Sequence, residues 1–174
     1  HNSKINFPCW VQPKLDGVRM IAKKENGNIL MWSRKGKEMV IPDKIATQLE
    51  LMLSEGQCVD GEIYVHDWSF QRIISAVKKK RADTELLEYH IYDSPHPSLS
   101  FEERVPKTTI NTTTFPIYCR DWNGKSFHLK NIKFVETVDA DDQEEFDFYE
   151  SKFISDGYEG MMVRNQNSLY KYKH

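Results

Sequence analysis

The sequence contains few cysteines and no pattern that would connect them. Cys9, Cys58 and Cys119 are odd in number, far apart and without a Cys-x-x-Cys pair. This spacing argues against a disulfide framework and against a zinc site. We therefore expect reduced thiols packed in a core, which is typical of a reducing compartment.

Long apolar runs, a signal peptide and an excess of positive charge are also missing. No uninterrupted apolar stretch reaches the roughly 18 residues that a membrane span requires. We expect no membrane partner and an intracellular protein, in the cytoplasm or the nucleus. The 24 basic and 26 acidic residues give a net charge of −2, so any contact with nucleic acid must come from local cationic patches.

What is present is enough for one domain with its own core. The chain has 174 residues, of which 39% are hydrophobic and 29% charged, and it contains no internal repeat. Period-two and helical patterns alternate along it. They predict strands at residues 9–13, 18–24, 29–32, 58–65, 89–93, 115–119, 132–138 and 158–164, and helices at 42–56, 69–80 and 139–153.

A short stretch near the start carries the most chemistry: Lys14-Leu15-Asp16-Gly17-Val18-Arg19. A lysine attacks as a nucleophile only in its neutral amine form, and a second cation such as Arg19 favours that form. Arg19 also offers a fork of donors that suits a phosphate. The alternative reading of this stretch alone is a solvated turn with a surface Lys-Asp pair.

Further polar groups occur at points where the chain changes direction or where an acid interrupts a strand. Arg34 and Lys35 lie in a cationic cluster after a hairpin that the Asn26-Gly27 pair predicts. Glu62 follows Gly61 inside a strand pattern, which indicates either a wet strand face or a carboxylate aimed into a site. For the cationic cluster alone, an exposed polar loop is the commoner meaning.

The series of motifs, taken in order, resembles the covalent nucleotidyltransferases. It consists of Lys14-x-Asp16-Gly17-x-Arg19, Ser33-Arg34, Asp60-Gly61-Glu62, Tyr92-Asp93 and Glu159-Gly160-Met161-Met162-Val163-Arg164. It is most similar to the adenylation domain of ATP-dependent DNA ligases of the small viral and phage type. The resemblance extends from Cys9 to the C-terminus and is weakest at residues 94–132.

The resemblance implies a role for each matching residue around the nucleotide. Lys14 would attack the α-phosphate of ATP and form lysyl-AMP, while Arg19 would bind phosphate oxygens. Glu62 would hold the ribose hydroxyls or a metal-bound water. Tyr92 would stack on adenine, where the family usually has Phe. Glu159 would help to bind Mg²⁺ or Mn²⁺.

The remaining matches concern DNA, the edge of the adenine ring and the last lysine motif of the family. Arg34, with Lys35 beside it, would grip the 5′-phosphate of nicked double-stranded DNA, to which AMP would be passed before the nick is sealed. Gln12 would read the adenine edge. Lys171 and Lys173 fit by letter the family's last lysine motif, but they follow Arg164 too closely. We therefore expect that motif beyond His174, and a monomer that lacks an OB-fold domain.

Three alternatives remain open on the sequence. An mRNA-capping guanylyltransferase shares the first motifs but would form lysyl-GMP, and it usually carries Asp-Gly-Leu where this chain has Glu159-Gly160-Met161. An RNA ligase more often departs from the first motif. A fragment that binds nucleotides or nicks without turnover is the third alternative.

The strand-rich pattern with interspersed helices predicts an α+β fold with mostly antiparallel sheets and flanking helices. The resemblance narrows this expectation to the ATP-grasp-like nucleotidyltransferase fold that DNA ligases and mRNA-capping enzymes share, with ATP bound between sheets.

Overall fold

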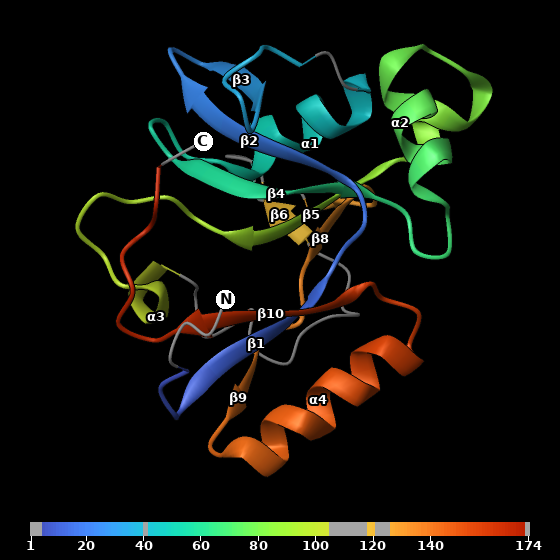
Figure 1. Cartoon of the computed structure of the whole chain (residues 1–174). Helices are drawn as coiled ribbons and strands as arrows, with labels where there is room; N and C mark the ends of the chain where they lie inside the picture. The colour runs from blue at the N-terminus through green and yellow to red at the C-terminus, as the bar shows by residue number, and fades with distance from the viewer. Residues whose placement is uncertain (1–4, 40–41, 105–117, 121–125, 173–174) are drawn as a thin grey trace.

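The computed structural model describes residues 5–39, 42–104, 118–120 and 126–172. Two sheets lie one above the other, and the chain passes from the lower to the upper sheet directly after Lys14 (Figure 1). In the described residues all but one of the strand pairs are antiparallel. The α+β architecture with mostly antiparallel sheets is confirmed.

The larger sheet has the order β3-β2-β4-β5-β8. Its strands are β2 (Val18–Glu25), β3 (Asn28–Ser33), β4 (Cys58–Tyr64), β5 (Glu88–Asp93) and β8 (Ile132–Phe134). The β2–β3 hairpin turns at Asn26 and Gly27, which both have positive φ, 53° and 76°. Two positive values are what the type I′ turn requires, so the hairpin prediction is confirmed.

One face of the larger sheet is covered by helices. They are α1 (Asp43–Met52) and α2 (Phe70–Lys78), and the chain continues through the 3₁₀ helix η1 (Ala82–Leu86). Ile45 and Leu49 of α1 and Ile73 of α2 are fully buried in the main core. Because side chains alternate along a strand, the opposite face carries the polar residues of β2 and β4 and faces the smaller sheet.

The smaller sheet has β1 (Cys9–Lys14) between β10 (Gly160–Asn165) and β9 (Val138–Ala140). Helix α4 (Gln143–Ser155) covers its outer side (Figure 1). Phe146 and Phe153 of α4 pack there with Cys9 and Val11. The short helix α3 (Phe101–Arg104) and the β6–β7 pair, Tyr118–Arg120 with Ser126–His128, complete the described elements.

Two predictions about the last third of the chain are wrong in detail. Residues 132–138 were expected as one strand, but β8 pairs with β5 while β9 pairs with β1, because the chain changes sheets between them. The helix expected from residue 139 begins at Gln143, since Asp139 and Ala140 belong to β9 and Asp142 caps the helix. The expected Asn123-Gly124 turn lies outside the described residues.

The described part of the chain contains no helix that is long and apolar enough to cross a bilayer. Cys9 and Cys58 are free thiols. Cys9 is packed in the core, as expected, whereas Cys58 is half-buried, and desolvation raises its pKa to about 11.

Candidate active site

Lys14 lies at the end of β1, where the smaller sheet meets the crossing to the larger one. In the β1–β10 register it is opposite Gly160. Its Nζ is 3.9 Å from Glu159 Oε1, and both side chains are about half exposed. A side chain at position 160 would meet nothing within 4 Å, so space remains beside the lysine. Lys14 and Glu159 therefore form an accessible pair.

Gly17 allows the chain to cross against β4. A Cβ atom at this position would lie 2.3 Å from the Ile63 carbonyl oxygen, a distance that no side chain tolerates. The Gly17 N–H donates to Glu62 Oε2 at 3.2 Å. The glycine of the first motif is thus required by a close backbone approach, and it joins that motif to Glu62.

Glu62 is held by hydrogen bonds at both carboxylate oxygens. Besides the Gly17 contact, the Tyr92 hydroxyl donates to Oε1 at 3.2 Å. Burial raises the pKa of Glu62 to about 7, while the two hydrogen bonds act in the opposite direction. Glu62 is therefore an acid whose charge changes near neutral pH.

A β-bulge explains how Tyr92 reaches Glu62. The β4–β5 register passes from Gly61 opposite Ile91 directly to Asp60 opposite Asp93, so Tyr92 is the extra residue on β5. A Cβ on Gly61 would lie 2.2 Å from the His90 carbonyl oxygen. The second Asp-Gly pair of the motif series is therefore also set by close packing of two strands.

Arg19 is paired with Asp60 instead of lying open beside Lys14. Its Nε donates to Asp60 Oδ1 at 3.1 Å and its Nη2 to Oδ2 at 2.6 Å. Asp60 is 1% exposed, whereas the Arg19 side chain is 29% exposed. Because the carboxylate compensates its charge, Arg19 favours the neutral amine of Lys14 less than a lone cation would.

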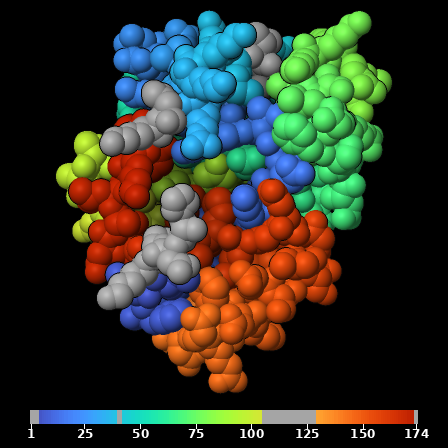
Figure 2. Space-filling model, in the orientation of Figure 1, coloured from blue at the N-terminus to red at the C-terminus, as the bar shows by residue number. Residues whose placement is uncertain are grey.

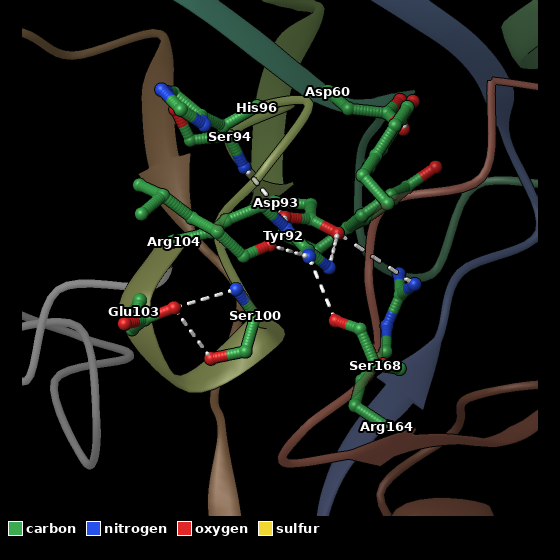
Figure 3. Close-up of polar contacts among 12 residues, drawn as sticks. Asp60, Tyr92, Asp93, Ser94, His96, Ser100, Glu103, Arg104, Arg164 and Ser168 are labelled. Atoms are coloured by element: carbon green, nitrogen blue, oxygen red, sulfur yellow. Dashed lines mark hydrogen bonds and ion pairs between the residues drawn. The ribbon is translucent and has the colours of Figure 1, made fainter.

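A second buried pair was not found by reading the sequence. Arg104 Nε and Nη2 donate to the two oxygens of Asp93 at 2.8 and 3.1 Å, and both side chains are almost fully buried. Arg164 Nη1 approaches the same carboxylate at 3.9 Å. Figure 3 shows both guanidinium groups reaching Asp93. Arg104 belongs to none of the sequence motifs, so no signal along the chain pointed to this pair.

Gln12 and Tyr92, both expected to contact the adenine base, lie largely in the core. Gln12 is 0% exposed; its Nε2 donates to the Tyr92 carbonyl and to Thr137 Oγ1, and its Oε1 accepts from Arg164. Tyr92 is 7% exposed, with the Arg164 guanidinium 5.4 Å from its ring centre. A part for either residue in base recognition stays a prediction.

The expected DNA-binding cations lie at the end of β3. Arg34 and Lys35 are exposed in a turn that Gly36 closes with a φ of +79°. Arg34 shares a surface pocket with Arg19, Tyr170 and Lys171. The pocket therefore brings a residue of the first motif and a residue of the second together with Lys171. Lys173 lies outside the described residues.

The carboxylates of Glu159 and Glu62 suit a magnesium ion that is also coordinated by a substrate. No group of three or more His, Cys, Asp or Glu side chains in the described residues could hold a metal ion alone. Mg²⁺ is usually bound by one or two carboxylates together with phosphates and waters. Glu159 fits this use better than Glu62, because its side chain is 46% exposed and both Glu62 oxygens already accept hydrogen bonds.

Comparison with known proteins identifies sequences and structures of the same kind. A family model described as ATP dependent DNA ligase domain matches residues 2–115. The DNA ligase of African swine fever virus, isolate Pig/Kenya/KEN-50/1950, is 30% identical over 165 residues, which cover 92% of this chain. This chain spans 37% of the length of that relative.

Solved structures agree with the sequence comparison. The crystal structure of Chlorella virus DNA ligase-adenylate is 25% identical, with a TM-score of 0.68 over 99% of this chain and 60% of the other. The ATP-dependent DNA ligase of bacteriophage T7 in complex with ATP shares the fold at 14% identity. Its TM-score is 0.60, over 95% of this chain and 59% of the other.

Proposed function

Because this chain belongs to the family of ATP-dependent DNA ligase domains, we propose that it is the adenylating part of a DNA ligase. The neutral Lys14 amine attacks the α-phosphate of ATP. An N–P bond forms, the bond to the leaving pyrophosphate breaks, and the amine loses a proton. AMP then passes to the 5′-phosphate of nicked DNA, and attack by the 3′-hydroxyl seals the nick and releases AMP.

The observation that carries this proposal is the position of Lys14. It ends a strand, its Nζ is 3.9 Å from Glu159, and three residues later Gly17 donates to Glu62. The ionised Glu62 offers acceptors for the ribose hydroxyls, and space beside Gly160 lets a phosphate approach the lysine. Tyr92 donates to Glu62, and Gln12 donates to the Tyr92 carbonyl, so both residues help to hold Glu62 in place.

A divalent cation, most simply Mg²⁺, with Mn²⁺ as the alternative, would be held by Glu159 together with the phosphates. It would neutralise negative charge on the triphosphate as pyrophosphate leaves. Glu62 would accept a hydrogen bond from a water on the cation, since each of its oxygens accepts only one hydrogen bond within the protein.

Arg34 and Lys35 would bind the broken strand of nicked double-stranded DNA. They are exposed, and Arg34 lines one pocket with Arg19 and Lys171, so several cations meet where a 5′-phosphate could enter. Phosphate contacts of this kind position DNA without reading its sequence. We propose that the protein acts on this substrate as a monomer.

The competing guanylyltransferase function makes a different covalent adduct, so the intact mass of the protein distinguishes the two. The purified protein is weighed before and after incubation with ATP and Mg²⁺, with GTP in parallel. We expect the mass of one AMP to be added with ATP only, and not to be added to Lys14→Ala.

A matched control is Lys44→Ala, which removes an exposed lysine of α1 paired with Glu85 and should be labelled normally. An adduct on Lys14→Ala would refute the assignment of the nucleophile. An adduct with GTP alone would assign the chain to the capping enzymes.

A further inference from the structure

Residues 166–172, which follow β10, run from α3 to the pocket that contains Arg19. We call this segment the strap. The Phe101 N–H donates to the Ser168 carbonyl at 2.8 Å, and the Glu102 N–H to the Gln166 carbonyl at 3.1 Å. Arg104 Nη1 donates to the Ser168 carbonyl at 2.9 Å, as Figure 3 shows. The strap is therefore anchored on α3 before it reaches Tyr170.

Tyr170 connects the strap to the buried carboxylate that holds Arg19. Its hydroxyl donates to Asp60 Oδ2 at 2.6 Å and accepts from Arg19 Nη2 at 3.2 Å. Arg19 Nη2 donates to that same Asp60 oxygen at 2.6 Å. Three groups from three separate segments thus close a triangle of hydrogen bonds, and Tyr170 touches both partners of the Arg19–Asp60 pair.

These contacts use only one edge of the Arg19 guanidinium. Nε and Nη2 are engaged with Asp60 and Tyr170, whereas Nη1 makes no hydrogen bond to the part of the chain that the structure describes. The Arg19 side chain is 29% exposed and lines the pocket that also contains Arg34 and Lys171. The donors on Nη1 are therefore the ones that an anion in the pocket could reach.

We propose that Tyr170 is a positioning residue that fixes the rotation of the Arg19 guanidinium through Asp60, so that Nη1 faces a phosphate group of the substrate. Without Tyr170, the orientation of the Arg19 guanidinium would depend on its two hydrogen bonds to Asp60 alone. The added hydroxyl, supplied by a strap that is anchored separately on α3, selects one orientation. In this way a residue near the end of the described chain acts on Arg19, the last residue of the motif that begins with Lys14.

The positioning itself is measured without reference to activity. NMR of the arginine Nε–H groups, with the Arg19 signal assigned from Arg19→Lys, reports the order and proton exchange of this guanidinium. Tyr170→Phe removes only the hydroxyl. We expect a less ordered Arg19 with faster exchange in Tyr170→Phe, and no change in Tyr149→Phe, which removes a hydroxyl on α4. An unchanged Arg19 signal in Tyr170→Phe overturns the proposal.

The consequence for catalysis rests on the proposed function and is tested separately. We expect Tyr170→Phe to slow lysyl-AMP formation about tenfold, the effect of one hydrogen bond to a charged group. Absence of lysyl-AMP from the unmodified protein would refute the proposed function, while the NMR comparison would still decide the position of Arg19. A disordered Arg19 with unchanged adenylation would overturn the catalytic part of the proposal.

Discussion

At the scale of single residues, Glu62 is a half-buried carboxylate that accepts hydrogen bonds from two other segments of the site. The Gly17 N–H and the Tyr92 hydroxyl both donate to its carboxylate, yet burial is the larger effect and raises its pKa to about 7. A raised carboxyl pKa means that the folded protein prefers the protonated form. The charged form, which accepts hydrogen bonds best, is therefore populated only as the pH rises through 7.

We predict that the rate of Lys14 adenylation rises through about pH 7 and that Glu62→Gln abolishes this inflection. The contribution of Glu62 to the free energy of unfolding should fall over the pH range in which the rate rises. Compared with Glu62→Gln, the contribution of Glu62 is fully present below its ordinary pKa of 4.5 and is lost as the pH rises through 7. Rates and unfolding midpoints between pH 5 and 9 would measure both. The same inflection in Glu62→Gln would assign it to another group.

At the scale of the elements, α4 shows how one capping residue sets a boundary. Asp142 lies in an extended conformation, and its Oδ1 accepts from the Glu145 N–H at 2.9 Å. The cap starts the helix four residues after the point that the acidic pattern indicates. The preceding residues thereby remain in β9, next to β1, which carries Lys14.

Asp142→Ala should lower the free energy of unfolding by about 1 kcal/mol, because the first turn of α4 loses the acceptor for its N–H. Urea denaturation would measure the loss. Asp141→Ala provides the comparison: it removes a neighbouring carboxylate while leaving the cap in place, and it should cost less. Equal losses in the two variants would show that net charge, and not capping, decides the effect.

At the scale of the whole molecule, Arg104 joins the two sheets. Asp93, which ends β5 of the larger sheet, accepts from Arg104 Nε and Nη2, and the Ser168 carbonyl after β10 of the smaller sheet accepts from Nη1. Figure 2 shows the segment after β10, in red, at the surface between the blue hairpin and the orange α4. The Arg104 guanidinium therefore links the larger sheet to the segment that follows the smaller sheet.

Arg104→Ala should destabilise the protein by about 3–5 kcal/mol, because the buried Asp93 loses its two hydrogen bonds from Arg104 and keeps only the longer contact with Arg164 as an ion pair. The exposed Lys44–Glu85 pair gives the contrast, since Lys44→Ala should cost no more than about 1 kcal/mol. Calorimetry or urea denaturation of both variants would measure the difference. A loss as small for Arg104 as for Lys44 would contradict the role of Arg104 as a link between the sheets.

Local signals along the chain were sufficient to predict most of the helices and strands. The Asn26-Gly27 turn and the strand before Lys14 were predicted correctly, because turn chemistry and period-two alternation act between neighbours. The switch of residues 132–140 from one sheet to the other was missed, since an apolar run does not reveal which strand will pair with it.

The sequence by itself determined an α+β fold and membership of the family of ATP-dependent DNA ligase domains, because the motif residues and their order are written along the chain. Only the tertiary structure decided how those residues are oriented. The β-bulge turns Tyr92 toward Glu62, and Asp60 and Tyr170 share the guanidinium of Arg19. Contacts across 30 to 151 positions of sequence depend on how the two sheets pack, and no local pattern encodes that.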